Sequence, residues 1–557
     1  MKNNNIAAAF NRNRNTISII LILVVGFILR FAGINWGLPD WMLPASFHPN
    51  EANYVRAAID VSNGAFSNLF WSKPSNFWIL ILGALFFIPT KLGLFNDITS
   101  YYILARLFTV ALSVLTIWLT YKTSRQLFGD KKIVLLPPLI VSIMMLHIYE
   151  SHIAWMNIPA TFMGALSLFY TSRIFSMSES ENYNRMSLIL NLLLSSVALG
   201  IGASLKYQLG FTVFPLIASI CFLRFKPEIK IRMLFTAGVI TVITFLLTNP
   251  YWLLNFRDGL SSITGTYHHY STGHGGIIPT VGLTFVDTYG NIFTLLKWWI
   301  GIPFAVLFIL GLINSLARHK RLDIFILSFL VPFYLFFGYF ILTFGRHLLP
   351  SLVLISILIT KLIYDSELFI NSSGKRYLQG KVITVARNVL ISGVVLCLVY
   401  SLLYSLAFVN IFSDVEGDTR VQATNWVNEN IPESSSVGID PGVSKWMRPR
   451  LDKEKHQIVK DYSESDYTII ISTQYVKMYH YLTHKELYKE EDWYPYQPPS
   501  EKNQQFYLKL FNETSSELIA EFRGEPHIFG LQFNTAEAPY HVWAVTHPTI
   551  RIYHLRK

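Results

Sequence analysis

The chain has 557 residues, of which 52% are hydrophobic and 15% are charged, whereas a soluble globular protein usually carries about 25% charged residues. Its apolar residues fall in repeated runs of about 20, the length that a helix needs to cross a bilayer, so the composition excludes a soluble globular protein. The net charge of +11 lies mostly in the loops between these runs, where it sets membrane topology, and it gives little reason to expect a nucleic-acid partner.

Charge divides the chain into two predicted domains. Residues 1–411 hold 30 basic and 14 acidic residues, whereas residues 412–557 hold 16 basic and 21 acidic residues. We therefore expect a basic membrane domain over 1–411 and a water-facing domain over 412–557. The two cysteines, Cys221 and Cys397, lie inside apolar runs and are expected to be small buried residues without a disulfide or metal.

The first apolar run, residues 17–34, follows Arg12 and Arg14, and the positive-inside bias places this end of the chain in the cytoplasm. No small-residue cleavage site follows the run and many apolar runs come after it, so we expect a retained helix rather than a signal peptide. The polar stretch of residues 35–75 should then face outward.

The second apolar run, residues 77–88, is short and ends in Pro89-Thr90-Lys91. Apolar runs of roughly 10–14 residues are more often interfacial or re-entrant than spanning, so we expect a juxtamembrane element over 77–93. This choice keeps the next basic cluster, which begins at Lys122, in the cytoplasm. About 11 spans are then predicted, near residues 17–34, 101–121, 133–149, 158–175, 186–204, 208–223, 232–249, 293–315, 323–343, 347–364 and 387–410.

With this number of spans, the C-terminal domain is expected on the extracytoplasmic side of the plasma or inner membrane. Its segment "DTRVQATNWVNENIP" indicates an amphipathic helix with Val421, Thr424, Trp426 and Val427 near one face. The segments "YTIIIST" and "HVWAVTH" indicate short strands. The predicted fold is therefore a polytopic α-helical membrane protein with an extracytoplasmic α/β domain.

Polar and ionisable side chains recur in the outward loops. The first loop carries His48, Asn50, Glu51, Tyr54, Arg56 and Lys73, the second carries Glu150, His152 and Asn157, the third carries His274, and Arg346 lies at the outward end of a span. Such groups are costly to hold at a membrane interface, so a cluster of them is a site hypothesis. A carboxylate suits a general base for an acceptor hydroxyl, while lysine and arginine neutralise a departing phosphate.

Each residue also has an ordinary interpretation. A loop carboxylate such as Glu51 is more often solvated or salt-bridged than catalytic, Lys73 suits a snorkelling anchor, and Arg346 suits a membrane-surface anchor. Only their recurrence on one predicted face favours a site.

Several motifs resemble those of the GT-C glycosyltransferases, and in particular of family 39, which includes protein O-mannosyltransferases and the aminoarabinose transferase of lipid A. They are "FHPNEANYVRAA", "WSKPSNFWIL", "HIYESHIAWMNIP", "TNPYWLL", "TGHGG", "GRHLLP" and the start of the C-terminal domain. Each motif is short, but their order and spacing match over nearly the whole chain.

The resemblance implies a GT-C fold that moves a sugar, with inversion, from a polyprenyl-phosphate donor in the membrane to a lipid, glycan or protein acceptor on the outer face. The donor phosphate would account for Lys73, Lys206 and Arg346. Of the remaining residues, His48, Tyr54, Arg56, Glu150, His152, Asn157 and His274 are the predicted substrate-binding set.

The sequence departs from the family pattern where the expected aspartates are Asn50 and Asn157. An amide positions a hydroxyl but does not take its proton. We predict that Glu51 takes the role of base, helped by Glu150. Alternatively, Asn50 binds donor or acceptor in a subfamily with altered chemistry, or the chain has lost catalysis and binds or transports a lipid-linked glycan. Dependence on a divalent metal ion stays open, because residues that would bind one are partly replaced by amides.

Overall fold

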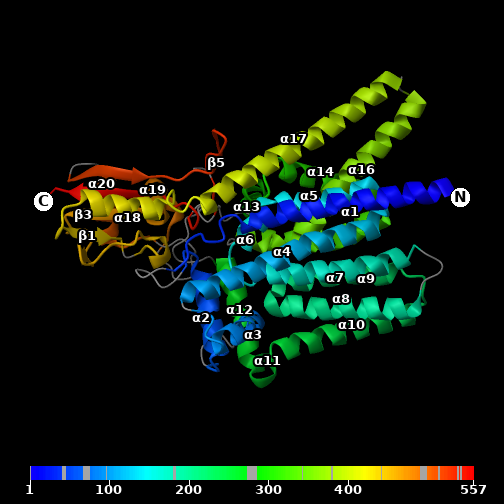
Figure 1. The fold of residues 1–557 in the computed structure, drawn as a ribbon, viewed down its shortest axis with the longest axis horizontal. Helices are drawn as coiled ribbons and strands as arrows, with labels where there is room; N and C mark the ends of the chain where they lie inside the picture. Colours follow the sequence, from blue (N-terminus) through cyan, green and yellow to red (C-terminus); the bar gives the residue numbers. More distant parts are fainter. Residues whose placement is uncertain are drawn as a thin grey trace.

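In the computed structural model of the protein, helices form an elongated bundle and a small sheet lies at one end of it, opposite the N-terminus (Figure 1). The structure describes residues 2–39, 46–66, 76–95, 97–179, 184–272, 285–340, 343–377, 380–440, 442–489, 498–511, 515–535, 538–539, 542 and 544–556. We call α1 to α17 the helical part, and α18 to β7 the C-terminal part.

The helical part contains α1 (Lys2–Phe31), α2 (Pro49–Ser62), α3 (Asn76–Lys91), α4 (Ile98–Phe128), η1 (Lys132–Leu135), α5 (Leu136–Ile143), α6 (Met145–Ser151), α7 (Asn157–Met177), α8 (Arg185–Leu205), η2 (Tyr207–Thr212), α9 (Val213–Phe222) and α10 (Pro227–Thr248). It continues with α11 (Tyr251–Leu254), α12 (Phe256–Thr272), α13 (Phe285–Trp299), α14 (Ile302–Arg318), α15 (Arg321–Gly338), η3 (Gly345–His347), η4 (Leu349–Ser351), α16 (Leu352–Tyr377) and α17 (Gly380–Ser413). Each predicted span overlaps one or more of these helices, which confirms the predicted helical fold of this part.

Two predicted spans are broken. The run 133–149 is bent by 54° between α5 and α6, where Met144 is extended. The run 293–315 is split between α13 and α14 at Gly301, whose φ of 85° ends a right-handed helix. Among the described helices, five are long and apolar enough to cross a membrane, or six when the bent pair counts as one span. The predicted total of about 11 spans therefore stays a prediction.

The predicted juxtamembrane element is α3, which packs against α2 at the end of the bundle that carries the sheet (Figure 1). The two helices approach so closely that a Cβ on Gly83 would lie 2.5 Å from the Val61 side chain. His48 caps the N-terminus of α2 and Pro49 takes the first helical position, where its missing N–H costs nothing. This sequence therefore fixes where α2 begins.

The C-terminal part is built on a five-stranded sheet in the order β2-β1-β3-β7-β4. Its elements are α18 (Thr419–Asn430), β1 (Ser436–Ile439), η5 (Lys445–Met447), β2 (Gln457–Val459), β3 (Tyr467–Ile471), α19 (Ser472–Thr483), η6 (Lys485–Leu487), α20 (Glu501–Phe511), β4 (Ser516–Phe522), β5 (His527–Ile528), β6 (Leu531–Gln532) and β7 (Ile550–Leu555). Strand β1 pairs parallel with β2 and β3, whereas β7 runs antiparallel to β3 and β4, with Ile469 opposite Ile552. Ala423 and Val427 of α18 pack on this sheet, so the predicted amphipathic helix and the "YTIIIST" strand are confirmed.

The second predicted strand of the C-terminal part, "HVWAVTH", is wrong. Of its residues, the structure describes 542 and 544–547, and 544–546 form turns. Val542 and Ala544 are fully buried in the apolar core of the helical part, so their burial joins the two parts rather than extending the sheet. Strand β5 also lies along α17, and Asn410 Nδ2 is 3.2 Å from His527 Nε2. Helix α17 ends at Ser413, close to the boundary at 411, which stays a prediction.

Candidate active site

The break between α5 and α6 is held by a buried arginine from α1. A break of this kind leaves carbonyl groups without helical partners, and inside a membrane these must be satisfied by protein. Arg30 is fully buried and donates to the carbonyls of Val141 (3.1 Å) and Ser142 (2.9 Å) and to Ser113 Oγ (2.6 Å). Its guanidinium therefore fixes the direction of α6, the short helix that carries Glu150.

Glu150 begins a chain of buried polar contacts that continues into two other elements. Asn157, the first residue of α7, donates from Nδ2 to Glu150 Oε2 at 2.7 Å. Lys206, between α8 and η2, donates from Nζ to Asn157 Oδ1 at 3.0 Å and to the carbonyl of Arg346 at 2.8 Å. Four predicted site residues from distant parts of the sequence are thus brought together.

The aromatic ring of Trp155 lies beside these buried polar contacts. The guanidinium carbon of Arg346 lies 5.2 Å from the Trp155 ring and 3.9 Å from the Phe344 ring, a cation–π geometry. At the start of α2 and on α2 itself, the His48 ring lies 5.4 Å from the Trp155 ring and the Tyr54 ring lies 6.4 Å from it. His48 and Tyr54 therefore join the same cluster.

Glu51 has an environment unlike that of a general base. Its side chain and that of Arg106 in α4 are both fully buried, and they form two charge-assisted hydrogen bonds, Nε to Oε1 at 2.8 Å and Nη2 to Oε2 at 2.7 Å. The backbone N–H of Ala154 also donates to Oε1, at 2.8 Å. Burial acts to raise the pKa of Glu51, but the Arg106 charge and these hydrogen bonds outweigh it and leave the pKa below its ordinary value.

The amino end of α2 presents two further predicted residues. The His48 Nδ1 accepts a long hydrogen bond, 3.4 Å, from the Glu51 backbone N–H, and burial lowers the pKa of His48 to about 4, so the ring is neutral near pH 7. Asn50 is half-buried, and no other residue in the described ranges forms a hydrogen bond with its side chain. Asn50 is therefore available to a substrate.

The other predicted residues stand apart from this cluster or cannot be placed. Arg56 is exposed on α2. His152 is fully buried, stacks on Phe412 at 4.6 Å, and lies within hydrogen-bond distance of the carbonyls of Ala32 and Ile148. Burial lowers the pKa of His152 to about 4, so a neutral ring donates to one carbonyl at a time and serves packing. Lys73 and His274 lie outside the described residues.

The cluster carries a surplus of positive charge. Glu51 and Arg106 neutralise each other, which leaves Lys206 and Arg346 against Glu150. Within the described ranges, neither of these two cations forms an ion pair with a carboxylate. A singly charged phosphodiester would balance the cluster, because lysine and arginine are the usual protein partners of phosphate.

The same residues suit a divalent metal ion poorly. Magnesium, calcium and manganese prefer several oxygen ligands, largely carboxylates. In the part of the chain that the structure describes, no three His, Cys, Asp or Glu side chains group in a way that would hold a metal ion, and Glu51 is already saturated by Arg106 and Ala154.

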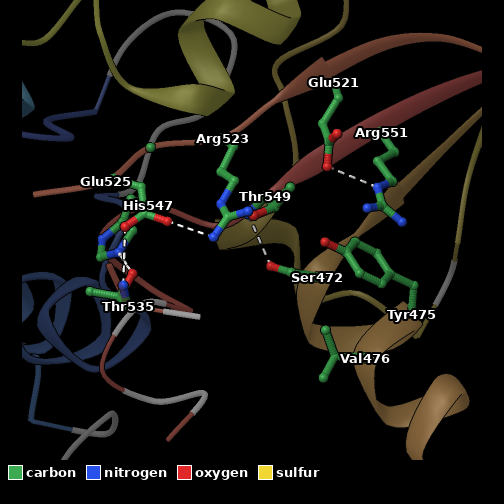
Figure 2. Close-up of a pocket in the computed structure, with 11 residues that line it drawn as sticks. Ser472, Tyr475, Val476, Glu521, Arg523, Glu525, Thr535, His547, Thr549 and Arg551 are labelled. Carbon is green, nitrogen blue, oxygen red and sulfur yellow. Dashed lines mark hydrogen bonds and ion pairs between the residues drawn. The ribbon is translucent and has the colours of Figure 1, made fainter. Parts of the chain in front are cut away.

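A pocket of about 170 Å³ lies in the C-terminal part between β4, β7 and the start of α19 (Figure 2). It contains two arginines, but each is already paired with a carboxylate. Arg523 lies 2.6 Å from Glu525, and Arg551 lies 3.0 Å from Glu521. Because these charges cancel, the pocket lacks the surplus charge of the cluster in the helical part.

Comparisons with known proteins agree with this architecture. Residues 91–258 match the family model for dolichyl-phosphate-mannose-protein mannosyltransferase, and this segment contains Arg106, Glu150, Asn157 and Lys206. An uncharacterized protein of Aquifex aeolicus is 25% identical over 245 residues, which are 42% of this chain and 43% of that protein. The chain thus matches less than half of the length of this relative.

Two solved structures are similar to nearly the whole chain. ArnT from Cupriavidus metallidurans, bound to undecaprenyl phosphate, has a TM-score of 0.50 at 12% identity and matches 97% of this chain and 98% of its own. The oligosaccharyltransferase AglB from Archaeoglobus fulgidus, in complex with an inhibitory peptide and a dolichol-phosphate, has a TM-score of 0.50 at 11% identity and matches 98% of this chain and 89% of its own. The chain therefore has the GT-C glycosyltransferase fold, and with the helices of the bundle this confirms the predicted helical membrane fold.

Two buried arginines of this region were not predicted from the sequence. Arg106 and Arg30 both lie within apolar runs, at positions where a charge is costly unless it is paired. That cost is a usable signal, because it predicts a buried partner for each of them. The sequence could not identify the partner, since Glu51 is 55 residues from Arg106 along the chain.

Proposed function

We propose that this chain is an integral membrane glycosyltransferase that moves a sugar from a polyprenyl-phosphate donor to an acceptor hydroxyl on the outer face of the membrane, with inversion. The observation that carries the proposal is the buried contact chain of Lys206, Asn157 and Glu150 beside Arg346, with its one surplus positive charge. The GT-C fold supports it, as do the undecaprenyl phosphate and dolichol-phosphate named with the two similar structures.

In this proposal Lys206 and Arg346 hold the donor phosphate. The acceptor oxygen attacks the anomeric carbon from the face opposite the phosphate, and the carbon–oxygen bond to the phosphate breaks as the new glycosidic bond forms. The electron pair leaves with the polyprenyl phosphate, whose growing negative charge the two cations stabilise. The hydroxyl proton passes to a carboxylate.

We assign that carboxylate to Glu150 rather than to Glu51. Both oxygens of Glu51 already accept strong hydrogen bonds from Arg106, so its lone pairs and its charge are committed. Glu150 accepts one hydrogen bond, from Asn157 to Oε2, and no donor in the described ranges reaches its Oε1. A general base needs such a free oxygen within reach of the proton.

This assignment also gives a reason for Asn157. An amide donates to Glu150 and accepts from Lys206 at the same time, which an ionised aspartate at 157 cannot do. The carboxylate that the family pattern places at 157 would thus be supplied by Glu150, seven residues earlier in sequence, at the end of α6. Asn50, with its available amide, would position donor or acceptor.

The topology belongs to the same proposal. The N-terminus and the C-terminal part lie at opposite ends of the bundle, which supports an arrangement with the two on opposite sides of the membrane (Figure 1). We propose that the N-terminus is cytoplasmic and that the C-terminal part and α2 face outward in the cell membrane.

The test is donor consumption by purified protein in lipid nanodiscs, supplied with a panel of polyprenyl-phosphate sugars and candidate acceptors. Wild type should consume one donor, and Glu150→Gln should lower kcat by about 10²- to 10⁴-fold, the usual contribution of a general base. Glu454→Gln, in an exposed turn of the C-terminal part, is the matched control and should leave kcat unchanged.

The outcomes separate the alternatives. Full turnover by Glu150→Gln would refute its role as base. Turnover by Asn50→Asp alone, with tight donor binding by an inactive wild type, would identify a chain that has lost catalysis and binds lipid-linked sugar. If only Glu51→Gln loses turnover without losing stability, the base is Glu51, as the sequence predicted.

A further inference from the structure

Two arginines of the C-terminal part contact a phenylalanine that lies just before α2. Phe47 is almost fully buried and directly precedes His48, the cap of α2. The guanidinium carbon of Arg420 lies 3.7 Å from the Phe47 ring centroid, and that of Arg450 lies 4.6 Å from it. Two cations from the C-terminal part therefore contact the residue next to the candidate active site.

Arg420 is itself held rigidly at the amino end of α18. It is nearly fully buried, and it donates from Nε and Nη2 to the two carboxylate oxygens of Asp418 at 2.8 and 2.6 Å. Asp418 also caps α18, because the same Oδ1 accepts from the Arg420 backbone N–H at 2.9 Å. A bidentate pair anchored to a helix end leaves the guanidinium few alternative positions.

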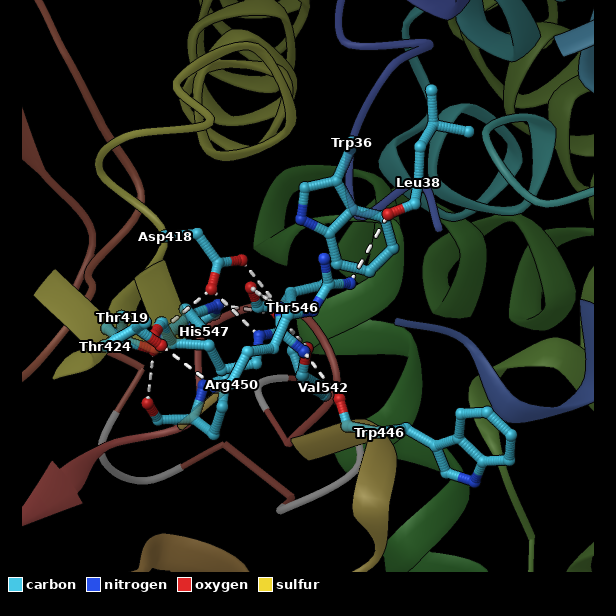
Figure 3. A network of polar contacts seen from close by, with 12 residues as sticks. Trp36, Leu38, Asp418, Thr419, Thr424, Trp446, Arg450, Val542, Thr546 and His547 are labelled. Atoms are coloured by element: carbon cyan, nitrogen blue, oxygen red, sulfur yellow. Dashed lines mark hydrogen bonds and ion pairs between the residues drawn. The ribbon is translucent and has the colours of Figure 1, made fainter. Parts of the chain in front are cut away.

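Arg450 links α18 to Leu38, which lies earlier in the loop that leads to α2 (Figure 3). Its backbone N–H donates to Thr424 of α18 at 2.9 Å, and its Nη2 donates to the carbonyl of Leu38 at 3.3 Å. Arg420 also lies over Trp36, with 5.6 Å between the guanidinium carbon and the ring. The described ends of the loop, residues 36–38 and 46–47, are thus both contacted.

From Phe47 the contacts continue into the candidate active site. The backbone N–H of Phe47 donates to the carbonyl of Gly37 at 2.9 Å, and Arg106 donates to the carbonyl of Trp36 at 2.8 Å while it pairs with Glu51. A shift of Phe47 would therefore move His48 and the first turn of α2, including Asn50.

We propose that Arg420 is a positioning residue, which acts through Phe47 to hold the first turn of α2 in register with Lys206 and Arg346. The expected effect on turnover rests on the proposed function, whereas the effect on the position of α2 does not. It gives the C-terminal part a definite role, because the placement of the first turn of α2 then depends on that part. Misplacement of a bound group by about 1 Å can cost about 100-fold in rate.

The test compares Arg420→Gln and Phe47→Leu in full-length protein in nanodiscs. Each should lower kcat by about 100-fold, with the donor KM within about threefold of wild type because the phosphate cations stay in place. In Phe47→Leu, which keeps the Arg420–Asp418 pair, hydrogen–deuterium exchange should become about tenfold faster in residues 46–58 and stay unchanged in β1 and β3. Arg420→Lys should restore part of both effects, and the double variant should lose no more than either single one.

Arg551→Gln is the matched control. This arginine also pairs with a glutamate and lies 4.7 Å from an aromatic ring, that of Tyr475, but both partners belong to the C-terminal part. It should leave turnover and exchange in residues 46–58 unchanged.

Unchanged exchange of residues 46–58 in both Arg420→Gln and Phe47→Leu would overturn the proposal, whatever the activity. Faster exchange throughout the C-terminal part in Phe47→Leu, which leaves the Arg420–Asp418 pair intact, would also overturn it, because the contact would then serve general stability. If wild type consumes no donor, the proposed function fails, while the exchange readout still decides the positioning role.

Discussion

The buried pair of Glu51 and Arg106 makes a prediction that separates a positioning carboxylate from a catalytic one. Arg106→Gln leaves Glu51 buried without its counter-charge, and Glu51→Gln leaves Arg106 in the same state. Breaking a buried ion pair on one side costs about 3–5 kcal/mol. Each single variant should therefore lose about that much free energy of unfolding.

The double variant Glu51→Gln/Arg106→Gln removes both charges and keeps similar volume. Replacing a buried pair as a whole is often close to neutral, so the double variant should lie within about 2 kcal/mol of wild type. The Ala154 N–H, which donates to Glu51 Oε1 at 2.8 Å, keeps an amide oxygen as its acceptor. The resulting coupling energy of the cycle should be at least about 4 kcal/mol, above the usual range for residues in direct contact, because each single variant leaves one charge buried without its partner.

Two quantities are measured on the same preparations. The first is the fraction of protein that stays folded across an unfolding series in mixed micelles, and the second is the turnover of the donor. If Glu51 only positions the loop, the double variant should recover stability together with a measurable part of wild-type turnover. A double variant as stable as wild type but with no turnover would refute the positioning role and make Glu51 the base.

Three further changes probe neighbouring contacts. Arg30→Met should lower stability by about 1–3 kcal/mol, because the Ser142 carbonyl at the α5–α6 break loses the Arg30 donor and the Val141 carbonyl keeps only a long bond, 3.4 Å, from the Met144 N–H. Thermal denaturation of the purified protein checks this. Gly345→Ala should cost about 1–3 kcal/mol and weaken donor binding, since its Cβ would overlap Trp299 Nε1 and displace the adjacent Arg346; equal donor affinity in the two proteins would contradict this. Burial lowers the pKa of His547 to about 3, whereas in the unfolded chain it has its ordinary value near 6.5. As pH falls below 6.5 the unfolded state therefore gains a proton that the folded state does not, which costs about 2 kcal/mol of stability at pH 5. In the same denaturation assay, His547→Gln should lose less stability than wild type between pH 7.5 and pH 5.

The sequence predicts the helical architecture well because apolar runs longer than about 17 residues have few alternatives to a helix in a membrane. It misses the break at Met144, which depends on Arg30, a partner remote in sequence. The break at Gly301, where the glycine adopts a positive φ, is missed as well. It also misses the turns over 544–546, where apolar residues that alternate like a strand are buried against another part of the chain.

The candidate site was predictable as a set of residue types and not as a set of roles. Glu150, Asn157, Lys206 and Arg346 belonged to the predicted set because charged groups near a membrane interface are costly and therefore informative. Which carboxylate is free could not be predicted, because the difference between Glu51 and Glu150 comes from the Arg106 side chain, a residue on a different helix. Roles followed from hydrogen-bond partners, which only the three-dimensional structure supplies.

The most direct test of the donor-phosphate cluster is the affinity of nanodisc-embedded protein for a polyprenyl phosphate without sugar, measured by native mass spectrometry over a concentration series. Lys206→Met and Arg346→Met should each weaken binding by at least about tenfold, which corresponds to about 1.4 kcal/mol. Lys230→Met is the matched control, because Lys230 contacts the Cys221 carbonyl away from the cluster, and it should bind like wild type. Equal affinity in all four proteins would contradict a phosphate site at Lys206 and Arg346.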